Sequence, residues 1–178
     1  MIGFLLRLGR LGLLAAGGAI VADRLLARVA VDRPTEPIRS LVVIDAPIER
    51  VWDVLADVEH QPDWMDDLLS VRLVTPPPIG VGTRAEGTVR IMGITVADPI
   101  TITEFDPPHR FAIRHEGAYT GSSVITLAPN VDGTGTVVTW DETLVAPVLP
   151  HLADRLGRPI FRAVFQRDLH NLRSRVEA

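Results

Sequence analysis

The 178-residue sequence contains no cysteine and no lysine, and aromatic residues make up only 5% of it. Without cysteine the chain has no disulfide, no thiolate nucleophile and no cysteine-ligated metal site. All 18 basic residues are arginines, and 22 acidic residues bring the formal net charge to -4. Because no global positive field attracts a polyanion, nucleic acid is not expected as a partner.

The signature motifs of several enzyme classes are also absent. The sequence has no G-x-S-x-G turn, no phosphate-binding loop and no H-E-x-x-H zinc motif. His60, Asp63, Asp66 and Asp67 offer nitrogen and oxygen ligands, but a solvated acidic helix end explains them better. The remaining histidines have no metal-site spacing. We therefore expect no metal and no cofactor.

The longest uninterrupted apolar run, Leu11 to Ala22, has twelve residues, fewer than the roughly 20 that cross a bilayer. Residues 1–28 fit an amphipathic surface helix, a span with snorkelling arginines, a signal peptide, or a helix packed on the domain. We expect membrane contact through this segment, and otherwise a cytoplasmic location. Residues 1–31 are thus a hydrophobic N-terminal helix, 32–37 a proline-stiffened linker, and 38–178 a single domain.

Most of this domain has the period-two pattern of β-strands. Strands are predicted at Ile38 to Ile44, Ser70 to Val74, Thr83 to Met92, Ile94 to Phe105, Arg110 to Glu116, Ser122 to Ala128 and Thr136 to Leu144. Glycine-containing turns between successive runs predict hairpins, and hence a mainly antiparallel sheet. A short amphipathic helix, Ile48 to Val58, follows the first strand.

The C-terminal residues 147–176 have the spacing of an amphipathic helix. The apolar side chains that recur at three and four residues are Phe161, Phe165, Leu169, Leu172 and Val176. This side must bury against the sheet. Pro159, which removes a backbone donor, predicts a break or kink near Gly157.

Several segments together resemble a known superfamily. They are Ala46 to Asp57 (APIERVWDVLAD), Pro62 to Trp64 (PDW), Gly80 to Thr83 (GVGT), Glu104 to Phe111 (EFDPPHRF) and Gly133 to Trp140 (GTGTVVTW). In this order they resemble the START-like helix-grip superfamily (SRPBCC), of the polyketide cyclase/dehydrase and lipid-transport type. The resemblance implies an α+β fold in which a curved antiparallel sheet of about seven strands wraps around the long C-terminal helix and leaves a cavity between them.

Strand alternation assigns side chains to the two faces of the sheet. Phe111, Ile113 and His115 share the more apolar face of one strand, and Trp140 and Glu142 share that of another. An inward His115 beside Glu142 could act as a general acid and base. The alternative is a solvated His115 at the strand end, with Glu142 paired to an arginine at the rim.

The remaining ligand-binding candidates are aromatic. Phe161 and Phe165 lie on the helix side that faces the sheet, and Trp64 follows Pro62 in a loop. Trp64 is interpreted either as a flap over the cavity mouth or as a plug at the core edge.

The predicted fold and cavity residues are compatible with two functions. The first is non-catalytic binding or transport of a hydrophobic small molecule, such as a lipid, an isoprenoid or a polyketide. The second is a polyketide cyclase or dehydratase that uses His115 and Glu142. Few polar residues face the expected cavity, so the sequence favours a ligand-binding protein over an enzyme. A regulator that contacts a protein partner stays open.

Overall fold

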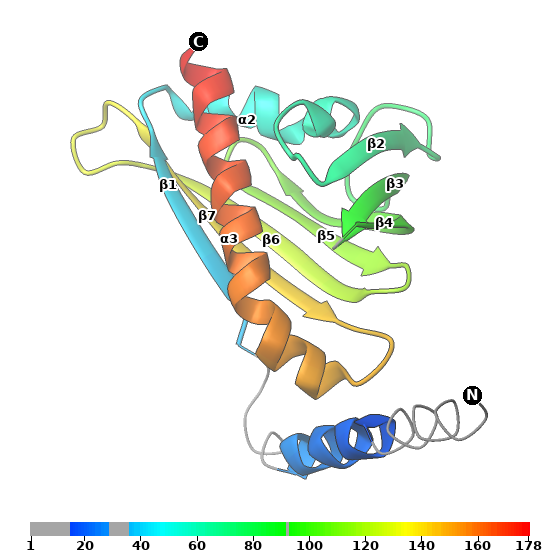
Figure 1. The fold of residues 1–178 in the computed structure, drawn as a ribbon. Coiled ribbons are helices and arrows are strands. Elements are labelled where there is room, and N and C mark those ends of the chain that lie inside the picture. Colours follow the sequence, from blue (N-terminus) through cyan, green and yellow to red (C-terminus); the bar gives the residue numbers. More distant parts are fainter. Residues whose placement is uncertain (1–14, 29–35, 92) are drawn as a thin grey trace.

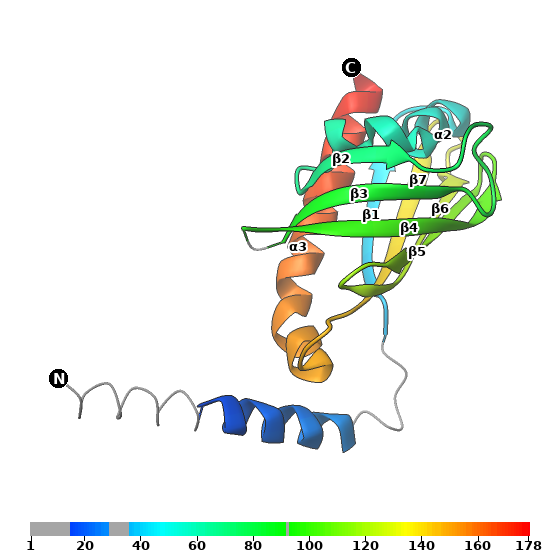
Figure 2. The ribbon, with the colours of Figure 1, turned by 90° about the vertical axis from the view of Figure 1, so that its right-hand side faces the viewer.

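A computed structural model describes residues 15–28, 36–91 and 93–178 of the protein. In chain order, the elements after the N-terminal helix are β1 (Ile38–Ile44), α2 (Ile48–Ala56), the 3-10 helix η1 (Val58–Asp63), β2 (Leu68–Leu73), β3 (Arg84–Ile91), β4 (Ile94–Asp106), β5 (Arg110–Glu116), β6 (Thr120–Pro129), β7 (Thr136–Val145) and α3 (Pro150–Glu177). Figures 1 and 2 show α3 crossing one face of a curved sheet, with α2 near its C-terminal end.

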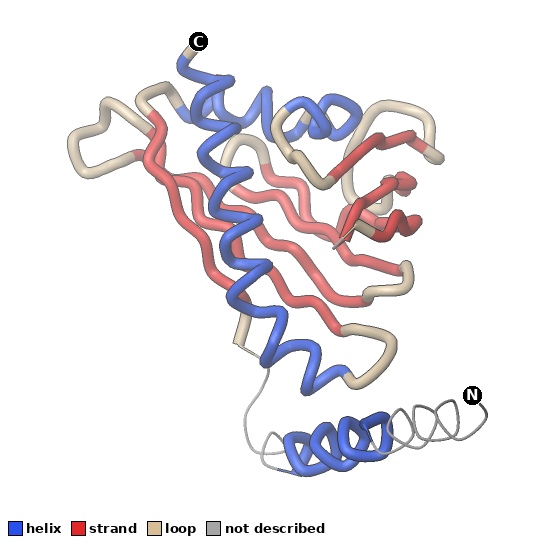
Figure 3. Tube along the Cα trace, viewed as in Figure 1, coloured by secondary structure: helices blue, strands red, loops and turns tan. Residues whose placement is uncertain are grey.

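The sheet has seven strands in the order β1-β7-β6-β5-β4-β3-β2, and every neighbouring pair is antiparallel. Five of the six pairings join strands that follow one another in the chain. In the sixth, β1 pairs with the last strand, β7. Figure 3 shows that all strands belong to one layer and that helices cover it on one side. The predicted α+β helix-grip fold is therefore confirmed.

The inner face of the sheet follows the predicted alternation. Every second residue of β1 from Ile38 to Ile44 is buried, and so is every second residue of β7 from Thr136 to Glu142. Apolar side chains on this face pack against Leu169, Leu172 and Val176 of α3, the last residues of the helix's apolar side. Burial of these large side chains, each worth roughly 1.5–3 kcal/mol, ties the helix to the sheet.

Helix α2 begins after Pro47 and carries Glu49 in its first turn, where a negative charge favours the helix N-terminus. Its predicted apolar stripe is buried through Val51, Trp52 and Leu55. The helix ends at Ala56 rather than at Val58, because the chain tightens there into η1.

Of the break or kink predicted near Gly157, the break is wrong. Helix α3 is continuous from Pro150 to Glu177, with Pro159 inside it. Arg158 holds the preceding turn, since its Nη2 donates to Asp154 Oδ1 at 2.9 Å and to the carbonyl oxygen of Glu36 at 2.8 Å. Pro159 has no N–H to donate to the carbonyl oxygen of residue 155. Residue 155 is exposed, so water can hydrogen-bond to this oxygen instead.

Residues 15–28 form a helix beside the start of α3, as both ribbon views show (Figures 1 and 2). Asp23 Oδ1 accepts a hydrogen bond from the Leu152 backbone N–H at 2.9 Å.

No helix within the described ranges combines the length and apolar character needed to cross a bilayer. Most of the predicted linker 32–37 and the first half of the apolar segment lie outside the described residues, so the division at residues 31 and 37 stays a prediction.

Candidate functional site

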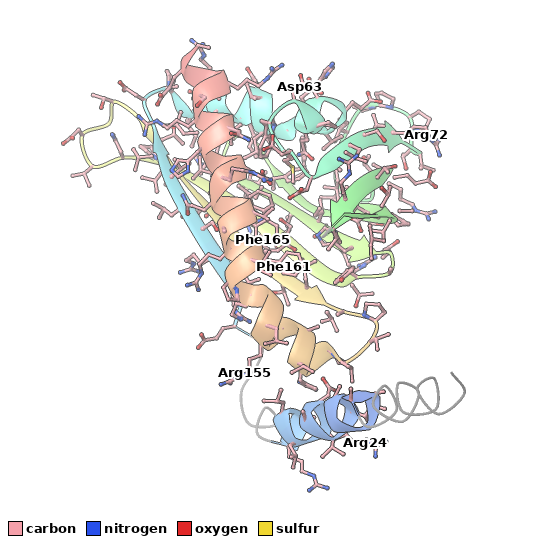
Figure 4. All side chains as sticks on the ribbon, viewed as in Figure 1. Arg24, Asp63, Arg72, Arg155, Phe161 and Phe165 are labelled. Carbon is pink, nitrogen blue, oxygen red and sulfur yellow. The ribbon has the colours of Figure 1, made fainter. Side chains whose placement is uncertain are left out.

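A cavity of roughly 160 Å³ lies between the inner face of the sheet and α3. Most of its wall is apolar, built by side chains such as Val96, Ile100, Ile113, Leu144 and Val164. The polar lining includes Asp98, His115, Ser123, Glu142 and Asp168. In Figure 4 the labelled Phe161 and Phe165 come from the middle of α3, and both line this space. An apolar hollow with a few buried polar groups is the usual form of a small-molecule site.

Small residues on β6 bring His115 and Glu142 together. His115 is on β5 and Glu142 on β7, and the intervening strand puts Gly121 opposite His115 and Ser123 opposite Glu142. Two strand spacings separate β5 from β7 by about 10 Å, so only small residues between them leave room for contact. Gly121 has φ +146°, and a Cβ there would lie 1.8 Å from the Thr143 carbonyl oxygen. Glycine is therefore required at this position.

A chain of polar contacts runs along the cavity wall. His115 Nδ1 is 2.8 Å from Asp98 Oδ2, and His115 Nε2 is 3.2 Å from Glu142 Oε1. Trp140 Nε1 donates to the other oxygen, Glu142 Oε2, at 2.9 Å. The Nε2–Oε1 approach lacks the alignment of a hydrogen bond, and neither atom has another protein partner. The side chains of His115 and Glu142 are only 13% and 3% exposed.

The protonation of His115 follows from these neighbours. Burial alone would lower the pKa of His115, but its interactions with Asp98 and Glu142 outweigh burial and raise the pKa to about 10. The imidazole is therefore a cation at neutral pH. In that form both ring nitrogens donate hydrogen bonds, and His115 can give up a proton but cannot accept one.

A second ionic group lies where α3 meets the loop before β2. Arg167 Nη2 is 3.0 Å from Asp168 Oδ1 and 3.1 Å from Asp67 Oδ2, and Arg167 Nε is 3.1 Å from Asp66 Oδ2. Asp168 is 1% exposed. Burial raises the pKa of Asp168 to about 6, although Arg167 opposes the shift. The cavity therefore has a carboxyl group that changes charge near neutral pH.

Six of the eight predicted site residues line the cavity: Ile113, His115, Trp140, Glu142, Phe161 and Phe165. The alternative in which His115 is solvated and Glu142 pairs with an arginine is wrong, since the two side chains are buried and adjacent. Their role in binding or catalysis stays a prediction.

Trp64 and Phe111 do not line the cavity and belong to the core instead. Trp64 is 1% exposed and packs edge-on against Trp140, with ring centroids 6.4 Å apart. Its loop is fastened to α3 because Asn171 Nδ2 donates to the Trp64 carbonyl oxygen at 3.1 Å. Of the two interpretations of Trp64, the plug at the core edge is therefore correct, and the flap over the cavity mouth is wrong. Phe111 packs edge-on against Phe105, with ring centroids 6.2 Å apart.

Sequence reasoning missed Asp98 and Asp168, although both carried a signal. Asp98 has the same parity as Ile100 and Ile102 on β4, so alternation places it on the inner face. Asp168 follows Phe165 by three residues and lies on the apolar side of α3. An acidic residue within an apolar face is the feature to look for, because an unpaired buried charge is costly and is retained only with a partner.

No three histidine, aspartate or glutamate side chains are grouped so as to hold a metal ion anywhere in residues 15–28, 36–91 or 93–178.

The comparisons with known proteins agree with this architecture. Residues 37–177 match the family described as polyketide cyclase/dehydrase and lipid transport. An uncharacterized protein of Mycobacterium tuberculosis is 28% identical over 149 residues, which cover 79% of this chain and 84% of that protein.

Solved structures are similar over most of the domain. A Thermus thermophilus protein is 25% identical, with a TM-score of 0.63 over 78% of this chain and 94% of its own. A START superfamily protein from Mycobacterium smegmatis has 15% identity and a TM-score of 0.66, covering 80% of this chain and 97% of its own. An aromatase/cyclase from a Streptomyces species has 19% identity and a TM-score of 0.63, covering 78% and 92%. The last two show the shared fold. The match over residues 37–177 establishes that the chain belongs to the polyketide cyclase/dehydrase and lipid-transport family.

Proposed function

We propose that the protein binds a hydrophobic small molecule in the cavity between the sheet and α3. The observation that carries this proposal is the apolar hollow itself, which tightly packed protein interiors do not normally leave. Its volume is comparable with the roughly 150 Å³ of an engineered apolar cavity that holds benzene. A second cavity of roughly 190 Å³ shares Tyr119, Leu144, Ile160 and Phe161 with the first, so a longer ligand can extend from one space toward the other.

The test is to fill the cavity and measure the loss of binding. Val164 lines the cavity and is half-buried, so Val164→Trp should occupy the space a ligand needs. Val131 is fully exposed in the turn between β6 and β7, and Val131→Trp is the matched control. Organic extraction of the purified protein followed by mass spectrometry, and titration with an apolar fluorescent probe, should detect a ligand in the native protein and the control. If the native protein neither carries a ligand nor binds the probe, the proposal fails.

A second candidate is a cyclase or dehydratase that acts in the same cavity. Its support is the adjacent acid and base: protonated His115 can donate a proton, while the unpartnered Glu142 Oε1 can accept one. A histidine with a pKa of about 10 suits general-acid catalysis poorly at neutral pH, because it holds its proton tightly. This observation favours binding over turnover. His115→Ala and Glu142→Gln should each abolish turnover of a polyketide-like substrate, and unaltered turnover in both would remove this candidate.

Membrane contact through residues 1–28 is also a proposal. Its support within the described helix is a set of exposed apolar side chains, Ile20, Val21 and Leu25, next to exposed Arg24 and Arg28. Flotation with vesicles that contain anionic lipid tests it. Val21→Asp with Leu25→Asp should abolish flotation of the full chain, and flotation that persists in this double variant would argue against contact by this face.

A further inference from the structure

Two buried polar atoms on the cavity wall have unused hydrogen-bonding capacity. Glu142 Oε1 is an acceptor and His115 Nε2 is a donor, and neither forms a hydrogen bond within the protein. They are 3.2 Å apart without being aligned. Buried polar groups are nearly always hydrogen-bonded, so two neighbouring exceptions on a cavity wall need a partner from outside the protein.

The other polar atom of each side chain already has a partner. His115 Nδ1 donates to Asp98, and Glu142 Oε2 accepts from Trp140. A ligand therefore meets one donor and one acceptor side by side. A hydroxyl group can accept from Nε2 and donate to Oε1 at the same time. A hydrocarbon leaves both atoms unpaired.

Charged ligand groups fit this position less well. A carboxylate can accept from His115 but places a second negative charge against Glu142, and an ammonium group places a positive charge against His115. The cavity lining as a whole contains the acids Asp67, Asp98, Glu142 and Asp168 but only the cations Arg90 and His115. Its excess of acids disfavours an anion further.

We propose that the cavity selects a neutral apolar molecule with a hydroxyl group, an alcohol or a phenol, over the matching carboxylic acid and the matching hydrocarbon. The hydroxyl lies against His115 and Glu142, and the apolar body extends toward Phe161 and Phe165 of α3. This selectivity rests on the proposed ligand-binding function and adds the chemistry of the ligand to it.

The test uses three probes that share one ring system: 2-naphthol, naphthalene and 2-naphthoate. Calorimetric titration of the full chain at neutral pH should give a Kd for 2-naphthol at least about tenfold lower than for either of the others. The reason is that each buried polar group left without a hydrogen bond weakens binding by about tenfold. Equal affinities for all three, or preference for 2-naphthoate, would overturn the selectivity while leaving ligand binding intact. Failure of all three to bind would overturn both.

Glu142→Gln tests the assignment to this site. The amide removes the negative charge and keeps the shape, so the preference for 2-naphthol over 2-naphthoate should fall by about tenfold or more. Glu104→Gln is the control, because Glu104 is exposed on the sheet and pairs with Arg110. The control should keep the native ranking. An unchanged ranking in Glu142→Gln, with a native circular dichroism spectrum, would overturn the role of Glu142; if that variant does not fold, the three-probe series on the native chain still decides the selectivity.

Discussion

The two halves of the closing helix α3 have different surroundings. From Phe165 onward five side chains are buried, and Leu169 and Leu172 are completely inaccessible to solvent. Between residues 150 and 164 none is buried, and Leu156 and Ile160 are 66% and 47% exposed. The first half lines the second cavity and, together with Phe165 and Asp168 at the start of the second half, the main one, while the rest of the second half is packed against the sheet. The comparison indicates that the second half of the helix supplies most of its packing against the sheet, while the first half borders the cavities.

The largest expected effect is on stability, and it should separate the two halves. Leu172→Ala should lower the free energy of unfolding by about 2–5 kcal/mol, because it leaves a cavity in the packed core. Leu156→Ala, the same change in the first half, should alter it by less than about 0.5 kcal/mol. Urea denaturation of both variants measures the difference. Equal losses would show that the two halves do not differ in packing.

The free energy of unfolding should depend on pH through Asp168, which is buried in the second half of α3. Asp168 has a pKa of about 6 in the fold and an ordinary value of 3.8. Because the folded pKa is the higher one, its stabilising contribution is complete below pH 3.8 and is lost as the pH rises through about 6. At 1.36 kcal/mol per pKa unit the full loss is about 3 kcal/mol.

Asp168→Asn keeps the shape and removes the charge, so it should gain stability over the native protein as the pH rises from about 4 to 7. Urea denaturation at several pH values measures this gain, and Asp66→Asn, an exposed partner of the same Arg167, is the control. Parallel pH profiles for the native protein and Asp168→Asn would exclude Asp168 as the source. The Asp66→Asn profile should follow that of the native protein.

The smallest expected effect concerns the start of the first half. Helix α3 follows Leu149, which has φ 50° and offers no side-chain cap, and Asp23 of the N-terminal helix accepts from the Leu152 N–H instead. Asp23→Ala should lower the free energy of unfolding by about 1 kcal/mol, the usual effect of losing a cap. Asp23→Asn, which keeps an acceptor oxygen, should lose less. Thermal denaturation compares the two, and faster hydrogen exchange at the Leu152 amide should accompany the Asp23→Ala change alone.

Sequence periodicity correctly predicted which way side chains point within a single strand. Strand alternation put His115 and Glu142 on the inner face, and both lie there, because neighbouring strand residues must point to opposite sides. The same rule places Asp98 on the inner face, but faces were assigned only for the strands that carry His115 and Glu142. Pro159 misled because the rule for an isolated helix ignores the contacts of Arg158 that hold the turn.

The sequence by itself determined the seven strands, the closing helix and the family, since each follows from short-range periodicity and ordered motifs. Only the tertiary structure separated the predicted side chains that line the cavity from those that fill the core. Trp64 fills the core beside Trp140 because the loop that carries it is fastened to α3. The contact between His115 and Glu142 depends on Gly121 and Ser123 of a third strand. Such contacts arise from packing between segments distant in the chain, and local periodicity contains no information about them.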